Sequence, residues 1–316
     1  IYTLSLHDAL PIFSLIMVNM YTKEAISKKE DNSKHRTALV LEGGAMRGIF
    51  SAGVIDVLME NNIHFDAVIG VSAGAAFGCN YKSHQPGRVI RYNRRFAKDW
   101  RYCSLRSLMK TGDLYGAEFC YHTLPKELDV MDKETYDSDP SRFVVVCTDT
   151  RTGKPVYKEL PELNDAALEW VRASASMPVV SRAVHIDGYS LLDGGISDSI
   201  PVQYARNQGY DRIVTVLTRP KDYVKAPTGH DHLYGLLLHK YPQVAASLRN
   251  RHVVYNRSKK MVHQLGCKGE LCVIYPEKEL DISRTEHDVA RMDRTYKEGR
   301  KRAQAMMPKI RKYLEQ

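Results

Sequence analysis

Short apolar runs alternate with helix-like patterns in the first part of the chain. Residues 37–41 (TALVL) and 65–69 are typical of buried strands, and residues 49–61 between them carry apolar side chains at helical spacing. A second helix is predicted to begin at Ser72. Strands and helices in this order form a parallel sheet with helices packed on its faces. The pattern therefore predicts an α/β fold with three α/β/α layers and a mostly parallel central sheet.

The rest of the chain is predicted to extend this sheet and then to change character. We expect a basic helical stretch over 81–127, strands over 142–147, 189–192 and 212–217, a hairpin return over 154–158 and a helix over 165–175. After Pro220 we expect a loop-rich stretch over 221–239, a helix over 242–265, a short strand over 271–275 and a basic amphipathic helix over 288–314. We therefore predict a catalytic domain over 37–220 and a smaller, mainly helical, basic region over 221–316.

The first 36 residues are predicted to lie outside the catalytic domain. Residues 1–12 (IYTLSLHDALPI) resemble a translated sequencing adapter, so we interpret 1–16 as an artefact or leader and expect the true start at Met17 or Met20. The apolar run here lacks the basic flank and cleavage site of a signal peptide and is too short to span a bilayer. Residues 17–36 are expected to form a flexible leader. We expect a soluble, cytoplasmic protein that is at most peripheral to the inner membrane face.

Positive charge is concentrated in two segments. The chain carries a formal net charge of +9, and residues 249–316 hold 17 Lys and Arg against 9 Asp and Glu. Residues 88–110 hold 8 basic residues and a single acid, Asp99. Two interpretations stay open, namely contact with an anionic phospholipid surface and ordinary solvated helix faces. Because no nucleic-acid-binding motif accompanies the charge, we expect no nucleic acid partner. The sequence does not indicate an oligomeric state.

The cysteines do not suggest a metal site. They lie at positions 79, 103, 120, 147, 267 and 272, and no pair has C-x-x-C spacing. Reduced thiols are therefore a better interpretation than a zinc site or a disulfide framework. We expect neither a metal nor another cofactor.

A glycine-rich loop follows the first predicted strand. It reads EGGAMRG and comprises Glu42, Gly43, Gly44, Ala45, Met46, Arg47 and Gly48. Consecutive glycines leave backbone N–H groups accessible, and the helix that follows adds free donors at its N-terminus. Such a loop binds a phosphate or a transient oxyanion. The dinucleotide motif needs glycine where this chain has alanine, and the P-loop needs a G-K-[ST] that this loop lacks.

A G-x-S-x-G motif follows the second predicted strand. It runs from Gly70 to Gly74 with Ser72 at its centre. The motif places a serine on a sharp turn between a strand and a helix, where small flanking residues permit close backbone approach. Because the carboxyl ends of parallel strands meet at one edge of the sheet, we expect Ser72 to lie beside the glycine loop. Together the two motifs predict a nucleophilic serine.

The residues alone leave open which group takes the proton from Ser72. Asp193 followed by His230, His232, His239 or His252 would give the order serine, acid, histidine. Alternatively, Asp193 follows a predicted strand and precedes two glycines, so its carboxylate could reach Ser72 directly. Aspartate is a weak base, so this second arrangement requires burial that raises its pKa. The third interpretation is an ordinary Asp-Gly turn.

The three motifs together resemble the patatin-like phospholipase family, in its bacterial form. EGGAMRG at 42–48, GVSAG at 70–74 and DGG at 193–195 occur in the family's order, and similar sequence surrounds them from residue 37 to about 206. The resemblance implies the patatin-like α/β/α fold. It also implies a hydrolase of lipid acyl esters, of phospholipase A, lysophospholipase or esterase type, without a cofactor.

The resemblance also implies roles for individual residues. Ser72 would be the nucleophile and Asp193 its partner, in a dyad without histidine supported by Gly70, Gly74, Gly194 and Gly195. Backbone N–H groups around Gly43, Gly44 and Ala45 would form an oxyanion hole, and Arg47 would stabilise the loop or bind an anionic head group. Ala45 replaces the family's usual glycine, which matters if its φ is positive.

Two further residues and two alternative functions complete the expectations. Pro178 and Arg182 are expected to shape the pocket rim. A Ser-Asp-His esterase of the α/β-hydrolase type is one alternative function. A non-catalytic protein that binds lipid or a membrane surface is the other.

Overall fold

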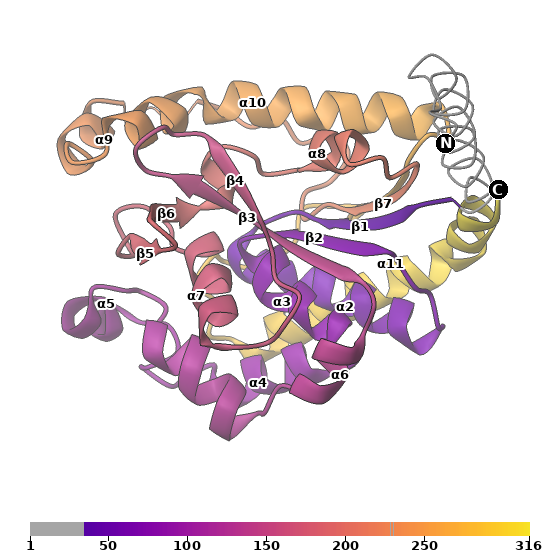
Figure 1. Ribbon diagram of the computed structural model, residues 1–316, viewed down its shortest axis with the longest axis horizontal. Coiled ribbons are helices and arrows are strands. Elements are labelled where there is room, and N and C mark those ends of the chain that lie inside the picture. The colour runs from indigo at the N-terminus through magenta and orange to yellow at the C-terminus, as the bar shows by residue number, and fades with distance from the viewer. Residues whose placement is uncertain (1–34, 228, 230) are drawn as a thin grey trace, which may run out of the picture. The chain divides into compact units, whose positions relative to one another are not determined.

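The computed structural model describes residues 35–227, 229 and 231–316. The interpretations of residues 1–34 concern positions outside this range. The segment Thr37–Gln316 forms one compact unit around a mixed sheet of eight strands (Figure 1). In chain order the strands are β1 (Thr37–Leu41), β2 (Ala67–Val71), β3 (Arg142–Asp149), β4 (Pro155–Glu159), β5 (Val184–Ile186), β6 (Tyr189–Asp193), β7 (Arg212–Val216) and β8 (Cys272–Ile274).

The sheet is parallel in its larger part. Its order is β5-β6-β3-β2-β1-β7-β8, and β4 also pairs with β3. Strands β3, β2, β1, β7 and β8 pair in parallel, whereas β4 and β6 run antiparallel to β3. The predicted mostly parallel sheet is therefore confirmed, and the antiparallel strands are confined to one side of it.

Helices cover both faces of the sheet. They are η1 (Ala45–Arg47), α2 (Gly48–Glu60), α3 (Ala73–Lys82), α4 (Arg88–Phe96), α5 (Leu105–Thr111), the π-helix η2 (Phe119–Leu128), α6 (Lys133–Ser138), α7 (Asp165–Ser174), η3 (Gly194–Ile196), α8 (Val202–Asn207), α9 (Asp231–Leu237), α10 (Pro242–Cys267) and α11 (Val289–Glu315). In Figure 1, α8 and α10 cover one face, and α2, α3, α7 and α11 cover the other. This arrangement confirms the three α/β/α layers.

Alternation along β1 explains the two layers of core. Leu39 and Leu41 are buried in one cluster with residues of α2, α3 and α11. Ala38 and Val40 are buried in a second cluster with residues of α8 and α10. Because successive side chains of a strand point to opposite faces, an uninterrupted apolar run such as TALVL requires cover on both sides.

Three predictions differ from what is observed. The stretch 221–239, expected to be rich in loops, contains the helix α9 (Asp231–Leu237). The strand expected over 65–69 begins at Ala67 and ends at Val71, because Asp66 instead accepts hydrogen bonds from the backbone N–H and hydroxyl of Thr37. The helical stretch expected over 81–127 is interrupted. Gly87 and Gly112, whose φ values are positive, separate its helices. Because β2 ends at Val71, Ser72 directly follows this strand.

The residues beyond Pro220 belong to the same compact unit. Strand β8 pairs in parallel with β7, and α11 packs along α2. The predicted domain boundary near Pro220 divides the sequence, and it stays a prediction. The compact unit contains the residues on both sides of this boundary. Within the described residues, no helix combines the length and apolar character needed to cross a membrane. The cytoplasmic location stays a prediction.

Candidate active site

Ser72 lies at the sharp turn between β2 and α3. Its backbone has φ 55° and ψ −122°, a conformation that non-glycine residues seldom adopt. The turn needs small neighbours, because a Cβ at Gly70 would collide with the backbone of Gly74 and Ala75. A Cβ at Gly74 would in turn collide with the carbonyl oxygen of Leu41 on β1. The strained conformation is therefore held by close backbone packing, as the motif predicted.

Asp193, the last residue of β6, meets Ser72 across the edge of the sheet. The hydroxyl of Ser72 donates a hydrogen bond of 2.6 Å to Asp193 Oδ2. The other carboxylate oxygen, Oδ1, accepts the N–H of Gly195 at 2.7 Å. Thr148 on β3 donates its hydroxyl to the Asp193 carbonyl oxygen, which fixes the end of the strand. The structure thus brings together two residues that lie 121 positions apart in the sequence.

Burial raises the pKa of the Asp193 carboxyl above its usual range. The hydrogen bond from Ser72, the positive charge of Arg251 and the N–H of Gly195 act in the opposite direction, but burial outweighs them. A carboxylate in a site that disfavours its charge is a stronger base than one in water. This is the condition that direct proton transfer from Ser72 to Asp193 requires.

The glycine loop borders the same position. The ideal Cβ of Gly43 would lie 3.0 Å from the Cβ of Ser72. Among the residues that the structure describes, no acceptor takes the backbone N–H of Gly43, Gly44 or Ala45. Glu42 anchors the loop, since its carboxylate accepts hydrogen bonds from the N–H of Thr218 and the hydroxyl of Tyr255. Three N–H groups that have no acceptor among the described residues therefore lie in an anchored loop next to the serine.

Ala45 holds a strained backbone within this loop. Its φ is +50°, in the left-handed region that favours glycine. We expect Ala45→Gly to raise the free energy of unfolding by about 1 kcal/mol, because left-handed backbone costs a residue with a Cβ roughly that amount. Urea unfolding measures the change. Ala305→Gly, at an exposed position of α11, is the matched control and should lower stability by about the same amount. Destabilisation by both changes would contradict the strain at Ala45.

Two cavities open on Ser72. The first is apolar, has an empty volume of about 970 Å³ and runs between α3, η2 and α7. The second, which we call the polar cavity because charged side chains are among its lining residues, has an empty volume of about 1520 Å³ and is bordered by the glycine loop, Asp193 and residues beyond β7. Ser72 and Ala45 line both. An ester whose carbonyl lies at Ser72 could therefore place a long apolar group on one side and a polar group on the other.

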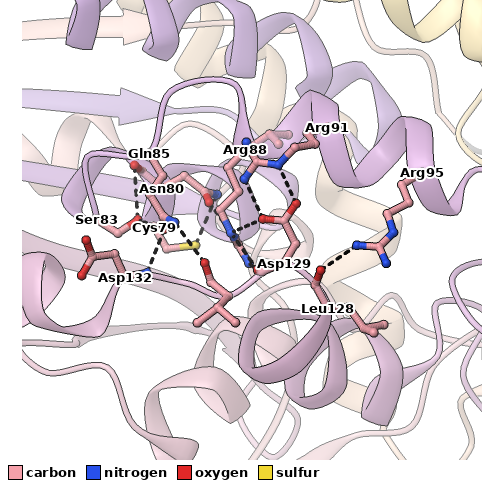
Figure 2. Close-up of polar contacts among 12 residues, drawn as sticks. Cys79, Asn80, Ser83, Gln85, Arg88, Arg91, Arg95, Leu128, Asp129 and Asp132 are labelled. Carbon is pink, nitrogen blue, oxygen red and sulfur yellow. Dashed lines mark hydrogen bonds and ion pairs between the residues drawn. The ribbon is translucent and has the colours of Figure 1, made fainter.

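A network of ion pairs and hydrogen bonds surrounds Asp129 (Figure 2). Arg88 on α4, which lines the apolar cavity, donates to the carbonyl oxygen of Asp129 and to Asn80 Oδ1 on α3. Arg91 donates two further hydrogen bonds to the Asp129 carboxylate, at 2.8 and 2.7 Å. Gln85 donates to the carbonyl oxygen of Val130. The network thus ties the chain after η2 to α3 and α4.

The remaining predicted residues are distributed as follows. Met46 lines the apolar cavity, and Arg47 and Pro178 line the polar one. Arg182 lines neither cavity; its N–H donates to Asp113 instead. His239 and His252 line neither cavity, and each has its Nδ1 near the backbone carbonyl oxygen of the residue three positions earlier. His230 and the His232 side chain lie outside the described structure.

Sequence reasoning missed several residues that hold the site. Ser174, at the end of α7, accepts the N–H of Ser72 and donates to the carbonyl oxygen of Val146. Arg251 on α10 donates to the carbonyl oxygen of Gly195 at 2.5 Å. Neither residue belongs to a motif with a distinct chemical pattern. Their positions depend on long-range packing, so the local sequence carried no signal for them.

Comparison with known families agrees with this geometry. Residues 39–206 match the family model described as patatin-like phospholipase, which covers the glycine loop, Ser72 and Asp193. The chain belongs to the patatin-like phospholipase family. Residues 241–315 of this patatin-like chain also match a domain of unknown function, DUF6363.

Several curated proteins are similar to this patatin-like chain. An uncharacterised Escherichia coli protein, YjjU, is 29% identical over 276 residues, which cover 84% of this chain and 75% of that protein. Lysophospholipase nte1 of Aspergillus oryzae is 30% identical over 56% of this chain but only 11% of its own length. An uncharacterised NTE family protein of Mycobacterium bovis is 30% identical over 54% of this chain and 46% of that protein. The crystal structure of VipD from Legionella pneumophila aligns with a TM-score of 0.44 and 12% identity, over 88% of this chain and 67% of that chain.

Proposed function

We propose that the protein is a serine hydrolase that cleaves lipid acyl esters through a dyad of Ser72 and Asp193. The observation that carries this proposal is the 2.6 Å hydrogen bond from the Ser72 hydroxyl to Asp193 Oδ2 at the junction of the two cavities. Family membership and the similarity to a lysophospholipase support a lipid ester as the substrate. The apolar cavity is suited to an acyl chain.

The proposed reaction is acyl transfer in two steps. Ser72 Oγ attacks the ester carbonyl carbon while Asp193 Oδ2 takes the hydroxyl proton, and the tetrahedral intermediate forms. The intermediate collapses, the bond to the alcohol breaks, and Asp193 returns the proton to the leaving alkoxide. Asp193 then takes a proton from water, whose oxygen attacks the acyl carbon. The bond from Ser72 Oγ to the acyl group breaks, Asp193 returns the proton to Ser72 Oγ, and the fatty acid leaves. Every proton transfer in this scheme uses a group of the dyad.

The glycine loop supplies the proposed oxyanion hole. The N–H groups of Gly43, Gly44 and Ala45, which have no acceptor among the described residues, would donate to the negative oxygen of the intermediate. Fixed donors of this kind stabilise charge that develops only in the transition state. The anchoring of Glu42 by Thr218 and Tyr255 keeps the loop in place before substrate arrives.

A fluorophosphonate probe tests the proposed nucleophile. The probe reacts with activated serines, so it should label the folded protein once, at Ser72, and Ser72→Ala should lose both the label and ester hydrolysis. Ser199→Ala is the matched control, because Ser199 also lines the polar cavity but bonds to the Gly195 carbonyl oxygen instead. Absence of labelling in the folded wild type would favour a non-catalytic lipid-binding protein.

The pH dependence of hydrolysis should report the Asp193 pKa. Because the base must be ionised and burial raises its pKa, we expect kcat/KM to fall as pH decreases, with an acid limb above the ordinary aspartate value near 4. The positive charge of Arg251 lowers this pKa. Arg251→Gln should therefore move the limb to higher pH, and Arg251→Lys should leave it closer to wild type. A limb that Arg251→Gln does not move would contradict this coupling.

We also propose that the rim of the site contacts an anionic lipid surface. Leu105 and Met109 on α5 are 72% and 81% exposed, and Arg106 and Lys110 lie beside them over the Trp100 ring. The segment after α5 reaches the site. Leu114 lines the polar cavity, and its N–H donates a hydrogen bond to the carbonyl oxygen of Val180. Apolar side chains flanked by cations are suited to an anionic interface.

Vesicle sedimentation tests this contact. The protein should sediment with vesicles that contain phosphatidylglycerol, and less with vesicles of phosphatidylcholine alone. Met109→Glu should weaken binding several-fold, because it places a negative charge at the interface. Val253→Glu on α10, at an exposed apolar position outside both cavities, is the control. Equal loss in both variants, or binding that salt does not weaken, would contradict the proposed contact.

A further inference from the structure

The polar cavity beside Ser72 contains more positive than negative charge. Among the described residues that line it, the carboxylates are Glu42 and Asp193. The cations are Arg47, Arg219, Lys225, Arg251 and Arg284. Such an excess is costly in a half-buried cavity unless an anion is bound there.

The two carboxylates are already engaged. Glu42 accepts hydrogen bonds from Thr218 and Tyr255, and Asp193 accepts from Ser72 and Gly195. Of the cations, Arg219 pairs with Glu279, which does not line the cavity. Arg251 donates its Nε proton to the carbonyl oxygen of Gly195. For Arg47, Lys225 and Arg284, no side-chain ion pair forms within the described residues.

The pKa values of Arg47 and Lys225 are lowered by burial and by the neighbouring positive charges. Arg47 Nε is buried and has no hydrogen-bond partner in the described structure. Burial, and then the charge of Arg219, lower the pKa of Arg47 to about 10. Burial, and then the charge of Arg251, lower the pKa of Lys225 to about 8. An anion in the cavity would supply the missing partner and favour both charged forms.

We propose that this cavity binds the phosphate of a net-anionic lipid head group while Ser72 attacks the acyl ester of the same molecule. The inference rests on the proposed hydrolase function, and it specifies the substrate class. Arginine is suited to phosphate because its planar guanidinium donates paired hydrogen bonds. The acyl chain then occupies the apolar cavity, and the phosphate lies on the opposite side of the serine.

The same residues disfavour a zwitterionic head group. A quaternary ammonium is normally held by aromatic faces or carboxylates. Here the Tyr255 ring already faces Lys225 Nζ at 4.4 Å, and the Tyr223 ring faces Arg219 at 4.4 Å. The Glu42 carboxylate already accepts hydrogen bonds from Thr218 and Tyr255. A choline group would therefore meet five cations with both carboxylates already hydrogen-bonded, and the site should prefer a head group without one.

This inference gives the C-terminal region a role in specificity. Lys225, Arg251 and Arg284 all lie beyond Pro220, and Arg251 and Arg284 fall within the match to the domain of unknown function. The catalytic motifs come from the first 195 residues. The C-terminal region would thus select the head group, and the patatin-like part would perform the chemistry.

The experiment compares three lipids that share one acyl chain, namely lysophosphatidic acid, lysophosphatidylcholine and monoacylglycerol, each below its aggregation concentration. We expect wild-type kcat/KM to be at least about 10-fold higher for lysophosphatidic acid than for the other two, a typical effect of charge complementarity. Lys225→Met and Arg284→Gln should each reduce this ratio several-fold, through KM more than kcat. Arg257→Gln, an exposed cation on the same helix as Arg251 that does not line the cavity, should keep it.

Each other outcome overturns the inference. Equal kcat/KM for the three lipids, or a ratio that the two variants do not change, means that the cations do not bind the head group. If the three lipids are hydrolysed equally while inorganic phosphate inhibits all of them, the cavity binds the free ion instead. If no lipid is hydrolysed and the fluorophosphonate fails to label Ser72, the proposed function itself is wrong, and the inference falls with it.

Discussion

Asp193→Asn should lower kcat/KM for an acyl ester by about a thousandfold or more, which is the range that loss of a general base produces. The amide can still accept a hydrogen bond from the Ser72 hydroxyl, so the local geometry can persist. It cannot take the proton, and no other titratable side chain in the described structure hydrogen-bonds to Ser72 Oγ. Steady-state kinetics with a soluble ester, with the variant free of wild-type enzyme, measure the loss.

The fold should survive this change, which separates catalysis from stability. Burial raises the folded-state pKa of Asp193 above its unfolded value. Ionisation therefore costs folding free energy as pH rises through the unfolded pKa, and this cost is fully present above the folded pKa. Removing the charge should thus leave the Tm at pH 8 unchanged or higher.

Asp198→Asn is the matched control for the loss of activity. Asp198 also has a pKa raised by burial, but its carboxylate accepts from the Tyr157 hydroxyl and lines neither cavity. Activity should be kept in this variant. Loss of activity in His239→Ala or His252→Ala with the fold intact, or turnover by Asp193→Asn near the wild-type rate, would instead favour a Ser-Asp-His enzyme.

The central fold could be predicted because its signals are local. The strands β1 (TALVL) and β7 (RIVTV) are mostly apolar runs, and such runs indicate strands buried on both faces. The turn at Ser72 could be predicted for the same reason, since small residues at Gly70 and Gly74 are a steric requirement of the turn itself. In each case the residues that reveal the element are the residues that form it.

The pieces that sequence reasoning missed depend on distant contacts. Nothing near Arg251 indicates that its guanidinium reaches the Gly195 carbonyl oxygen, and nothing near Glu42 indicates its bond to Tyr255. The sequence left open whether φ of Ala45 is positive, because the family has glycine at this position but alanine seldom adopts that conformation. Functional sites are where local preference and the folded structure disagree most often.

The charge on α11 shows the same limit. Its basic residues suggested a surface for anionic lipid, yet Arg300 pairs with Glu60 of α2, Arg302 with Glu277, and Arg294 with Asp281. Part of the positive charge is therefore used to fasten the helix to the compact unit. Contact between α11 and a membrane stays a prediction, and deleting the helix would test folding rather than binding.

Gly299→Ala should lower the free energy of unfolding by at least about 2 kcal/mol, a typical cost of overpacking a core. Gly299 on α11 lies against α2, where a Cβ would collide with the carbonyl oxygen of Phe50. Gly53 on α2 makes the reciprocal approach, because its Cβ would collide with the carbonyl oxygen of Tyr296. The atoms on both sides are backbone, so neither can move aside as a side chain could.

The sign of this effect is what makes it informative. In an open helix, alanine for glycine raises stability by about 1 kcal/mol, because alanine loses less conformational freedom on folding. Gly235→Ala in α9, where a Cβ would meet only Arg249 Nη2 at 3.5 Å, should show that ordinary gain. Urea unfolding of the two variants therefore compares the same substitution at a tight and an open position. Stabilisation by Gly299→Ala would mean that α11 does not pack this closely on α2, and the account of how the C-terminal helix joins the fold would be wrong.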